Sequence, residues 1–343
     1  MTAYITGSGS HLPDRVVANE DLAERLGLDA ERIFKSSGIR RRHWVEDGTK
    51  TSSLARVALQ RALTDAQIAS AEVDYLLFGT MTPDRFIPGS ASAIQKAIGF
   101  GEIPCLDIRA ACCNALYALQ LATALINSGT ARNVAICLAE IQSRYLDLSA
   151  ESATLSMLFG DGASALIVSA EPQPNGDAAS SIEIVDILLA TDGSYVDDLG
   201  IRSPGTEFNF IDSAGGLKHR ADYLPRMNGS SVILQASRKM IAACRTILDR
   251  HQLNAEDVRW IVPHQANVNL LAQVARGLGC GDGSGEVIYV LEECGNTSSA
   301  SMGIALDTLR SMGRVQSGDY LLLPAFAAGF TWGAALCRAS NTG

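Results

Sequence analysis

Two stretches of the chain can be laid over each other without a gap. Residues 106–129 read LDIRAACCNALYALQLATALINSG, and residues 290–313 read VLEECGNTSSASMGIALDTLRSMG. Each passes from a short segment through small and polar residues into a longer stretch with helical spacing of apolar residues, and each ends at a glycine. At the constant offset of 184 residues, Cys112 falls on Asn296. We therefore expect both side chains at equivalent strand-to-helix junctions of a duplicated structure.

The internal similarity extends over most of the chain. Residues 63–78 align with residues 248–263, and each segment reads as a helix end, an acidic turn and a buried strand. Strands and helices that alternate in two similar halves predict two α/β units with mostly buried sheets. We place the N-terminal half at residues 1–172 and the C-terminal half at residues 173–343, because a polar stretch with Pro and Gly lies at that boundary.

The composition indicates a globular protein. Of the 343 residues, 47% are hydrophobic and 19% are charged, which is enough apolar material for one large core or two fused ones. The formal net charge of -9 argues against nucleic acid as the main partner, since binding to phosphates needs a basic face. There is no signal-peptide pattern at the N-terminus, and no apolar run reaches the roughly 18 residues of a membrane span. We expect a cytoplasmic protein that does not bind a membrane.

The eight cysteines do not suggest a disulfide or zinc framework. Cys105, Cys137, Cys244 and Cys337 lie in apolar runs, and no CxxC pair occurs. Most of them are therefore predicted to be small core residues, and no metal site is expected.

Cys112 is the exception, because it stands where a nucleophile is expected. It lies at the predicted start of a helix, where the macrodipole favours a thiolate and free backbone N–H groups can bind an oxyanion. The adjacent Cys113 points in a different direction and is predicted to pack in the core. His264 follows the predicted strand at residues 260–263. If the two halves pack about a pseudo-twofold axis, Cys112, His264 and Asn296 face one cleft.

These residues lie in motifs that resemble the β-ketoacyl-acyl carrier protein synthase III family of the thiolase-like superfamily. The most specific motifs are VPHQAN at residues 262–267 and CGNTSSAS at residues 294–301. Five further segments extend the resemblance over nearly the whole chain: SGIR (37–40), MTPD (81–84), FGDGA (159–163), MNGSSV (227–232) and GFTWG (329–333). The resemblance implies an α/β thiolase-like fold, in which two pseudo-symmetric halves form a five-layered αβαβα core.

The resemblance also implies a reaction. Cys112 would accept an acyl group from a thioester, with the oxyanion bound by the backbone N–H groups of Cys112 and Ala328. His264 and Asn296 would hold the thioester carbonyl of a malonyl-acyl carrier protein and stabilise the enolate formed by decarboxylation. The enolate would then attack the acyl-cysteine in a Claisen condensation of fatty acid or polyketide-type biosynthesis. The implied partners are a second copy of the chain, acyl carrier protein, and an acyl-CoA or acyl-carrier donor; no cofactor is expected.

Several further residues are candidates for the substrate site. The predicted substrate-binding residues are Ile87, Arg109, Asn114, Gly229, Asn267 and Phe326, and Arg32 and Arg40 are predicted on the CoA side. Arg32 stands where family members that use acetyl-CoA carry a Trp that stacks on adenine. Ile87 stands where a Phe often reaches across the dimer, and Arg109 replaces the commoner Ala. Arg109 either binds a carboxylate on the acyl group or forms a salt bridge under the helix. These departures favour specialised metabolism.

The acidic carrier protein requires a basic docking surface. The candidate segments are residues 40–43, 218–220 and 238–239, and Arg276.

Two alternative functions remain open on the sequence. One is transfer of the acyl group from the cysteine to a hydroxyl or amine, although Asn296 favours condensation because simple transfer needs no enolate site. The other is a non-catalytic protein that binds acyl chains or shapes a heterodimer. Thiolysis is disfavoured, because Cys337 lies in a predicted strand and not in a Gly-rich loop.

Overall fold

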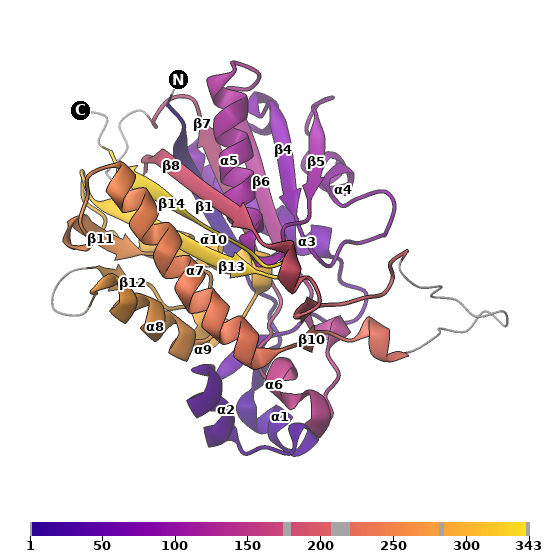
Figure 1. Cartoon of the computed structure of the whole chain (residues 1–343). Coiled ribbons are helices and arrows are strands. Elements are labelled where there is room, and N and C mark those ends of the chain that lie inside the picture. The colour runs from indigo at the N-terminus through magenta and orange to yellow at the C-terminus, as the bar shows by residue number, and fades with distance from the viewer. Residues whose placement is uncertain (1, 174–179, 207–219, 281–284, 341–343) are drawn as a thin grey trace.

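The computed structural model describes residues 2–173, 180–206, 220–280 and 285–340. Its described residues form a hydrogen-bonded sheet of ten strands built from two five-stranded halves (Figure 1). From the centre outward, the N-terminal half contains β1 (Tyr4–His11), β7 (Gly162–Ser169), β6 (Asn133–Glu140), β4 (Tyr75–Gly79) and β5 (Cys105–Ile108). The C-terminal half contains β8 (Ile182–Thr191), β14 (Thr331–Ala339), β13 (Tyr320–Ala327), β11 (Val258–Ile261) and β12 (Glu286–Val287). We number the five sheet strands of each half by their order along the chain. From the centre of the sheet outward, both halves then have the strand order first, fifth, fourth, second, third, so the topology is repeated.

The two halves of the sheet join at their central strands. β1 and β8 pair only at Tyr4 with Glu183 and Ile5 with Ile182. The division at residues 172 and 173 stays a prediction; it lies beside residues 174–179, which fall outside the described residues.

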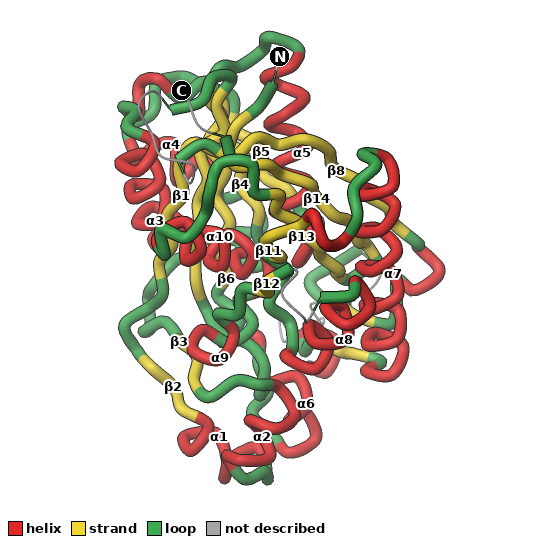
Figure 2. The backbone as a smooth tube through the Cα atoms, turned by 90° about the vertical axis from the view of Figure 1, so that its left-hand side faces the viewer, coloured by secondary structure: helices red, strands yellow, loops and turns green. Residues whose placement is uncertain are grey.

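Helices cover both faces of each half-sheet. α3 (Thr51–Ala66) and α4 (Ala91–Ile98) lie on the outer face of the N-terminal half, and α7 (Gly229–Arg250) and α8 (Val268–Leu278) on that of the C-terminal half (Figures 1 and 2). Between the halves lie α5 (Asn114–Asn127) and α10 (Ser301–Ser311). α5 packs against strands of both halves, namely β4, β6, β8 and β14. This is the five-layered αβαβα arrangement expected from the sequence.

Burial on both faces explains the near-continuous apolar strands. Every residue of β7 is buried, and so is every residue of β6 after Asn133. The helix α3 approaches β1 closely because β1 carries glycines at the contact. A Cβ atom at Gly7 would lie 2.4 Å from the carbonyl oxygen of Ala62, and one at Gly9 would lie 2.4 Å from that of Ala58.

Smaller elements form the remaining parts of the described structure. They are β2 (Val16–Ala18), β3 (Arg41–His43), β9 (Leu199–Gly200), β10 (Arg226–Met227), α1 (Asn19–Leu26), α2 (Ala30–Ser37), α6 (Ala153–Ser156) and α9 (Leu291–Cys294). The 3-10 turns are η1 (Ser70–Glu72), η2 (Ala111–Cys113), η3 (Ser143–Tyr145), η4 (Ala150–Ser152), η5 (Gly193–Tyr195), η6 (Arg220–Tyr223), η7 (Ala255–Asp257) and η8 (Ser298–Ala300). α1, α2 and α6 gather at one end of the molecule (Figures 1 and 2), where Leu22, Ile33 and Met157 share an apolar cluster.

One expectation about the duplication is wrong. Cys112 follows β5, as predicted, but Asn296 follows the short helix α9 and not a strand. The physical reason lies in the contacts of α9. Leu291 is buried in the cluster with Ile33, and the neighbouring Glu292 and Glu293 form ion pairs with Arg40 and Arg41.

The motif FGDGA has a structural explanation in Asp161. Its buried carboxylate accepts hydrogen bonds from the backbone N–H of Val45, at 2.9 Å, and from the backbone and hydroxyl of Ser143, at 2.9 and 2.6 Å. Asp161 therefore fixes two loops to the start of β7, the strand that lies next to β1 in the sheet.

Candidate active site

A cavity of about 260 Å3 opens beside Cys112. Its volume is slightly below the roughly 300–1,000 Å3 that is usual for small-molecule sites. The lining residues come from both halves and are mostly apolar: Met81, Thr82, Pro83, Phe86, Arg109, Ala111, Cys112, Gln142, Tyr145, Leu155, Phe159, Leu199, Gly200, Ile201, Ser203, Pro204, Pro225, Ser298 and Ala328. Such a cavity suits an acyl chain whose reactive end lies at the thiol.

Cys112 is held in the η2 turn that precedes α5. The preceding residue, Ala111, has a φ of 48°, in the left-handed region that costs a non-glycine residue roughly 1–2 kcal/mol. The Sγ atom lies 3.6 Å from the hydroxyl oxygen of Ser298. As predicted, Cys113 packs in the core, where its thiol donates to the carbonyl of Thr331.

The expectation that Cys112 rests as a thiolate is wrong. Burial raises the pKa of the Cys112 thiol to about 11, the hydrogen bond with Ser298 opposes this rise, and the charge of Glu140 adds to it. The helix α5 begins only at Asn114, so the thiol does not stand at the first helical residue. At neutral pH the sulfur therefore carries a proton that must leave before it can attack.

Asn296 is fixed through its backbone and through its side-chain oxygen. Its N–H donates to the carbonyl of Leu158 at 2.8 Å, and its carbonyl accepts from the N–H of Gly160 at 3.0 Å. The Oδ1 atom accepts from the N–H of Ser298 at 2.9 Å. Among the described residues the Nδ2 group has no hydrogen-bond partner, so it is available to a ligand.

His264 is buried at the end of β11. Its N–H donates to the carbonyl of Pro324 at 3.0 Å, and its Nδ1 lies 2.7 Å from the hydroxyl oxygen of Ser301. That hydroxyl already accepts from the N–H of Gln265 at 3.1 Å. Among the described residues Nδ1 is the acceptor within reach of the Ser301 hydroxyl, so we assign the hydroxyl hydrogen to Nδ1 and the ring proton to Nε2. Burial lowers the pKa of His264 to about 4, so the ring is neutral at pH 7 and acts as a hydrogen-bond donor without charge.

The segment of residues 296–301 connects the three predicted catalytic residues. It begins with Asn296, contacts Cys112 through Ser298, and contacts His264 through Ser301. Ala328, the predicted second oxyanion donor, lies on the wall of the same cavity as Cys112.

The structure corrects two of the predicted substrate-binding residues. Asn114 is fully buried, and its Oδ1 accepts from the N–H of Ala110 at 2.6 Å, so it stabilises the turn before the helix. Phe326 is 5% exposed and packs against Phe330 in the outer core of the C-terminal half. Neither side chain lines the cavity. Phe326 lies within β13, whose side chains alternate between the two faces of the sheet, and Asn114 starts α5 with its side chain turned into the core.

Three other predicted substrate-binding residues do not line the cavity of their own chain. Gly229 starts α7, and Asn267 caps α8 while its amide donates to the carbonyl of Ser36 at 2.8 Å. Ile87 is 79% exposed. Their predicted roles toward a substrate stay predictions, whereas Arg109 does line the cavity.

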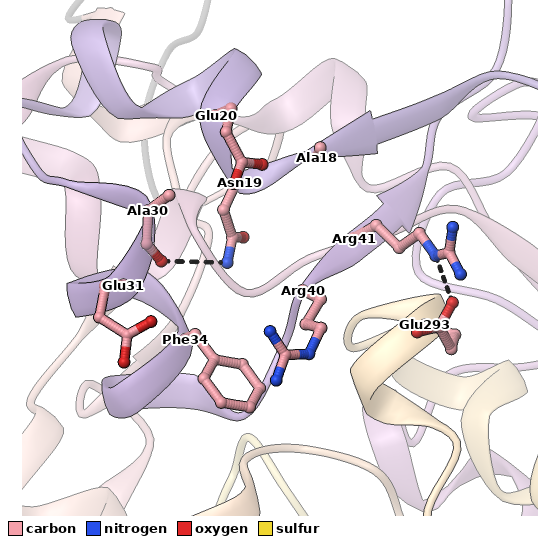
Figure 3. A pocket seen from close by; sticks show the side chains of 9 residues that line it. All are labelled: Ala18, Asn19, Glu20, Ala30, Glu31, Phe34, Arg40, Arg41 and Glu293. Atoms are coloured by element: carbon pink, nitrogen blue, oxygen red, sulfur yellow. Dashed lines mark hydrogen bonds and ion pairs between the residues drawn. The ribbon is translucent and has the colours of Figure 1, made fainter.

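The two residues predicted on the CoA side lie apart from the cavity beside Cys112. Arg32 is exposed on α2, and Arg40 lines a separate pocket between α1 and α2 (Figure 3). There its guanidinium lies 4.0 Å from the centre of the Phe34 ring and bonds Glu292 at 2.6 Å. Within the basic segment 40–43, Arg42 is fully buried and cannot dock a partner.

Several site residues are absent from the sequence-based prediction. Gln142, Tyr145 and Ser298 line the cavity, and the buried Glu140 lies behind Ser298. Ser298 belongs to the CGNTSSAS motif, so its place in that motif could have identified it as a residue of the site. Glu140 is a lone acidic residue at the end of an apolar strand, and this position could have identified it as a candidate site residue.

The fold and the comparisons below define a thiolase-like acyltransferase. Residues 106–193 match the family 3-oxoacyl-[acyl-carrier-protein (ACP)] synthase III, and residues 248–339 match its C-terminal region. The β-ketoacyl-[acyl-carrier-protein] synthase III of Rhodospirillum centenum is 36% identical over 338 residues, which are 98% of this chain and 99% of that protein. That of Rhodospirillum rubrum is 38% identical over 337 residues, with the same coverage.

Solved structures agree with these matches. The 3-oxoacyl-[acyl-carrier-protein] synthase III from Aquifex aeolicus VF5 has a TM-score of 0.84 at 31% identity and covers 98% of this chain and 99% of its own. The priming β-ketosynthase from the R1128 polyketide pathway has a TM-score of 0.86 at 30% identity, and the match covers 98% of this chain and 96% of that chain. The chain belongs to the β-ketoacyl-acyl carrier protein synthase III family. The predicted fold, enzyme class and condensing function are thereby confirmed. No helix in the described part of the chain is both long and apolar enough to cross a membrane.

Proposed function

We propose that this chain forms an acyl-Cys112 intermediate and condenses it with a malonyl group carried on acyl carrier protein. The observation that carries the proposal is the segment of residues 296–301, which contacts Cys112 and His264 and contains Asn296. A nucleophile and two donors held by one segment match the needs of a two-step acyl transfer and condensation.

In the first step the Cys112 sulfur attacks the thioester carbonyl of the donor. The tetrahedral oxyanion is bound by the backbone N–H groups of Cys112 and Ala328, and the donor thiol leaves. The neutral His264 and the amide of Asn296 take no part in this step.

In the second step these two donors bind the carbonyl oxygen of the malonyl thioester. Loss of CO2 places negative charge on that oxygen, and the resulting carbanion attacks the acyl carbon of the acyl-cysteine. The bond from that carbon to the Cys112 sulfur breaks, so the free cysteine is regenerated and the β-ketoacyl group stays on the carrier protein. A neutral imidazole suits this task because its Nε2–H stabilises the enolate without protonating it.

The first prediction separates the two steps. Replacing His264 or Asn296 by Ala removes one enolate donor, so CO2 release from malonyl-acyl carrier protein should fall by roughly 10²–10³-fold. Acylation of Cys112 by the donor, followed by intact mass, should stay within about threefold of wild type. Equal losses in both steps, or efficient transfer to an alcohol without CO2 release, would contradict the proposal.

We further propose that the acyl group carries a carboxylate at its far end. Arg109 is the one charged residue lining the cavity in the described structure, and no ion pair joins it to an acid there. The predicted alternative, a salt bridge under the helix, is not formed among these residues. Tyr145 lies nearby, since the charge of Arg109 opposes the rise in the pKa of Tyr145 that burial causes. The acyl chain therefore meets a cation in a mostly apolar cavity, as a dicarboxylic acyl group requires.

The second prediction compares donors of equal chain length. Wild-type enzyme should load succinyl-CoA about 10–100-fold faster than butyryl-CoA, because a charge-assisted hydrogen bond contributes about 1.5–3 kcal/mol. The variant Arg109→Met keeps an unbranched apolar stem, removes the charge and should reverse this preference. Preferential loading of butyryl by wild type, unchanged in the variant, would contradict a carboxylate site and leave the condensing function intact.

A role in specialised metabolism is consistent with this pocket. It is supported by the likeness to the priming ketosynthase of a polyketide pathway and by Arg32 at the place of the adenine-stacking Trp. We propose a polyketide-type priming step over housekeeping fatty acid initiation.

We also propose a homodimer through the free edge of β5. In the described structure β5 is the outermost strand of its half (Figure 1), and the nearby Phe86, Ile87 and Leu106 are 71%, 79% and 42% exposed. An apolar, unpaired strand edge is a surface that proteins normally cover. A second copy would cover it and bring Ile87 to the partner's acyl pocket.

The third prediction concerns this surface. Light scattering of the wild type at micromolar concentration should give twice the mass of 36.3 kDa, and Ile87→Asp should shift the protein toward monomer. Met312→Asp, at a residue of similar apolar character on another surface, should remain dimeric. A monomeric wild type would contradict the dimer.

For the carrier protein, we propose docking near Arg238 and Arg276. Both are exposed, and no ion pair joins either to an acid in the described structure. Of the remaining candidates, residues 218 and 219 lie outside the described residues.

A further inference from the structure

A buried carboxyl group lies behind the nucleophile. Glu140, the last residue of β6, is fully buried, and none of the ion pairs in the described structure includes it. Its carboxylate accepts from the hydroxyl of Ser299 at 2.6 Å, the hydroxyl of Thr82 at 3.0 Å and the backbone N–H of Met81 at 3.1 Å. A buried acid without a cation costs several kcal/mol, which hydrogen bonds only partly offset. Such a residue needs a functional reason.

Ser298 connects this acid to the thiol. Its hydroxyl oxygen lies 3.6 Å from Cys112 Sγ and 3.5 Å from Glu140 Oε1. Ser298 has a φ of 50°, a strained conformation that tends to occur at functional sites. Ser298 therefore lies between the thiol and the carboxylate, with both contacts at the outer limit of a hydrogen bond, and a small approach of the three groups would connect them for transfer of one proton.

Cys112 requires a proton acceptor. Burial raises the pKa of the Cys112 thiol to about 11, so the protonated thiol predominates at pH 7. His264 is a poor base, because burial lowers its pKa to about 4. In contrast, burial raises the pKa of Glu140 to about 7, which is the range in which a carboxylate can exchange protons at physiological pH.

We propose that Glu140 accepts the proton of Cys112 through the hydroxyl of Ser298 during acylation, an inference that rests on the proposed acyl-Cys112 intermediate. The thiol proton moves to Ser298 Oγ as the hydroxyl hydrogen moves to Glu140 Oε1. The sulfur forms its bond to the thioester carbon, and the bond from that carbon to the donor sulfur breaks. The proton then returns along the same path to the departing thiolate, which leaves as a thiol, and Glu140 is again a carboxylate.

The groups that surround Glu140 set its pH dependence. The η8 turn, the end of β4 with the loop after it, and the segment after β6 pack against it. They contribute side chains or backbone groups that do not titrate: Ser298, Ser299, Thr80, Met81, Thr82 and Gln142. Among the described residues, the titratable groups that its charge affects are Cys112 and Tyr145. The hydrogen bond from Ser299 lowers the pKa of Glu140, so its removal must raise that pKa.

The test measures single-turnover acylation of Cys112 by an acyl-CoA between pH 5.5 and 9.5, with intact mass as the readout. In wild type the rate should rise with pH and level off near pH 7, because Glu140 accepts a proton only when ionised. Glu140→Gln should be roughly 100-fold slower at pH 7.5 and should lose the inflection, since general base catalysis contributes at least that factor. Ser298→Ala should show the same loss because the path is broken.

Ser299→Ala is the matched control, since Ser299 binds Glu140 but does not contact Cys112. It should keep the acylation rate at high pH and shift the inflection above pH 7, an effect that a purely structural role of Glu140 would not produce. If Glu140→Gln does not fold, as judged by its thermal melt, the pH profiles of acylation in Ser298→Ala and Ser299→Ala test the proposal. An inflection that stays near pH 7 in all three variants, or acylation rates of Glu140→Gln and Ser298→Ala within threefold of wild type at pH 7.5, would overturn the proposal. Absence of any adduct on wild type would instead contradict the acyl-cysteine itself.

Discussion

The contact between Cys112 and Ser298 joins the two halves of the molecule at the site of chemistry. The thiol belongs to the turn before α5, and the hydroxyl belongs to the turn before α10, so the contact lies where the two inner helices begin. Three residues further along, Ser301 holds the ring of His264. The internal duplication thus supplies two helix starts that face each other, and the proposed reaction uses both.

Burial at this junction determines the protonation of each group. It keeps Cys112 as a thiol, keeps His264 neutral and raises the pKa of Glu140 to about 7. A neutral imidazole can stabilise an enolate without quenching it, and a protonated thiol is protected from unwanted reactions until a base removes its proton. The absence of a preformed thiolate is therefore compatible with a nucleophilic Cys112, provided that the proton has a path.

Sequence patterns predicted the arrangement of the halves and the place of Cys112 after β5 because both follow from local order. Apolar strands and helices repeat at a constant offset, and motifs around Cys112, His264 and Asn296 are contiguous in the chain. The cavity wall is different, because Gln142, Tyr145 and Leu199 converge from segments that only the tertiary fold brings together. Asn114 and Phe326 were misassigned since sequence does not reveal which face of a turn or strand a side chain takes. The protonation of Cys112 was also misjudged, because helix position predicts the dipole but not the depth of burial.

The most direct test of the acyl-cysteine is to locate the acyl group after incubation with panels of acyl-CoA and acyl-carrier donors. Intact mass followed by peptide mapping should find one acyl group on wild type, on the peptide that contains Cys112, and none on Cys112→Ala. No adduct on wild type, or the same adduct on Cys112→Ala, would contradict the covalent mechanism.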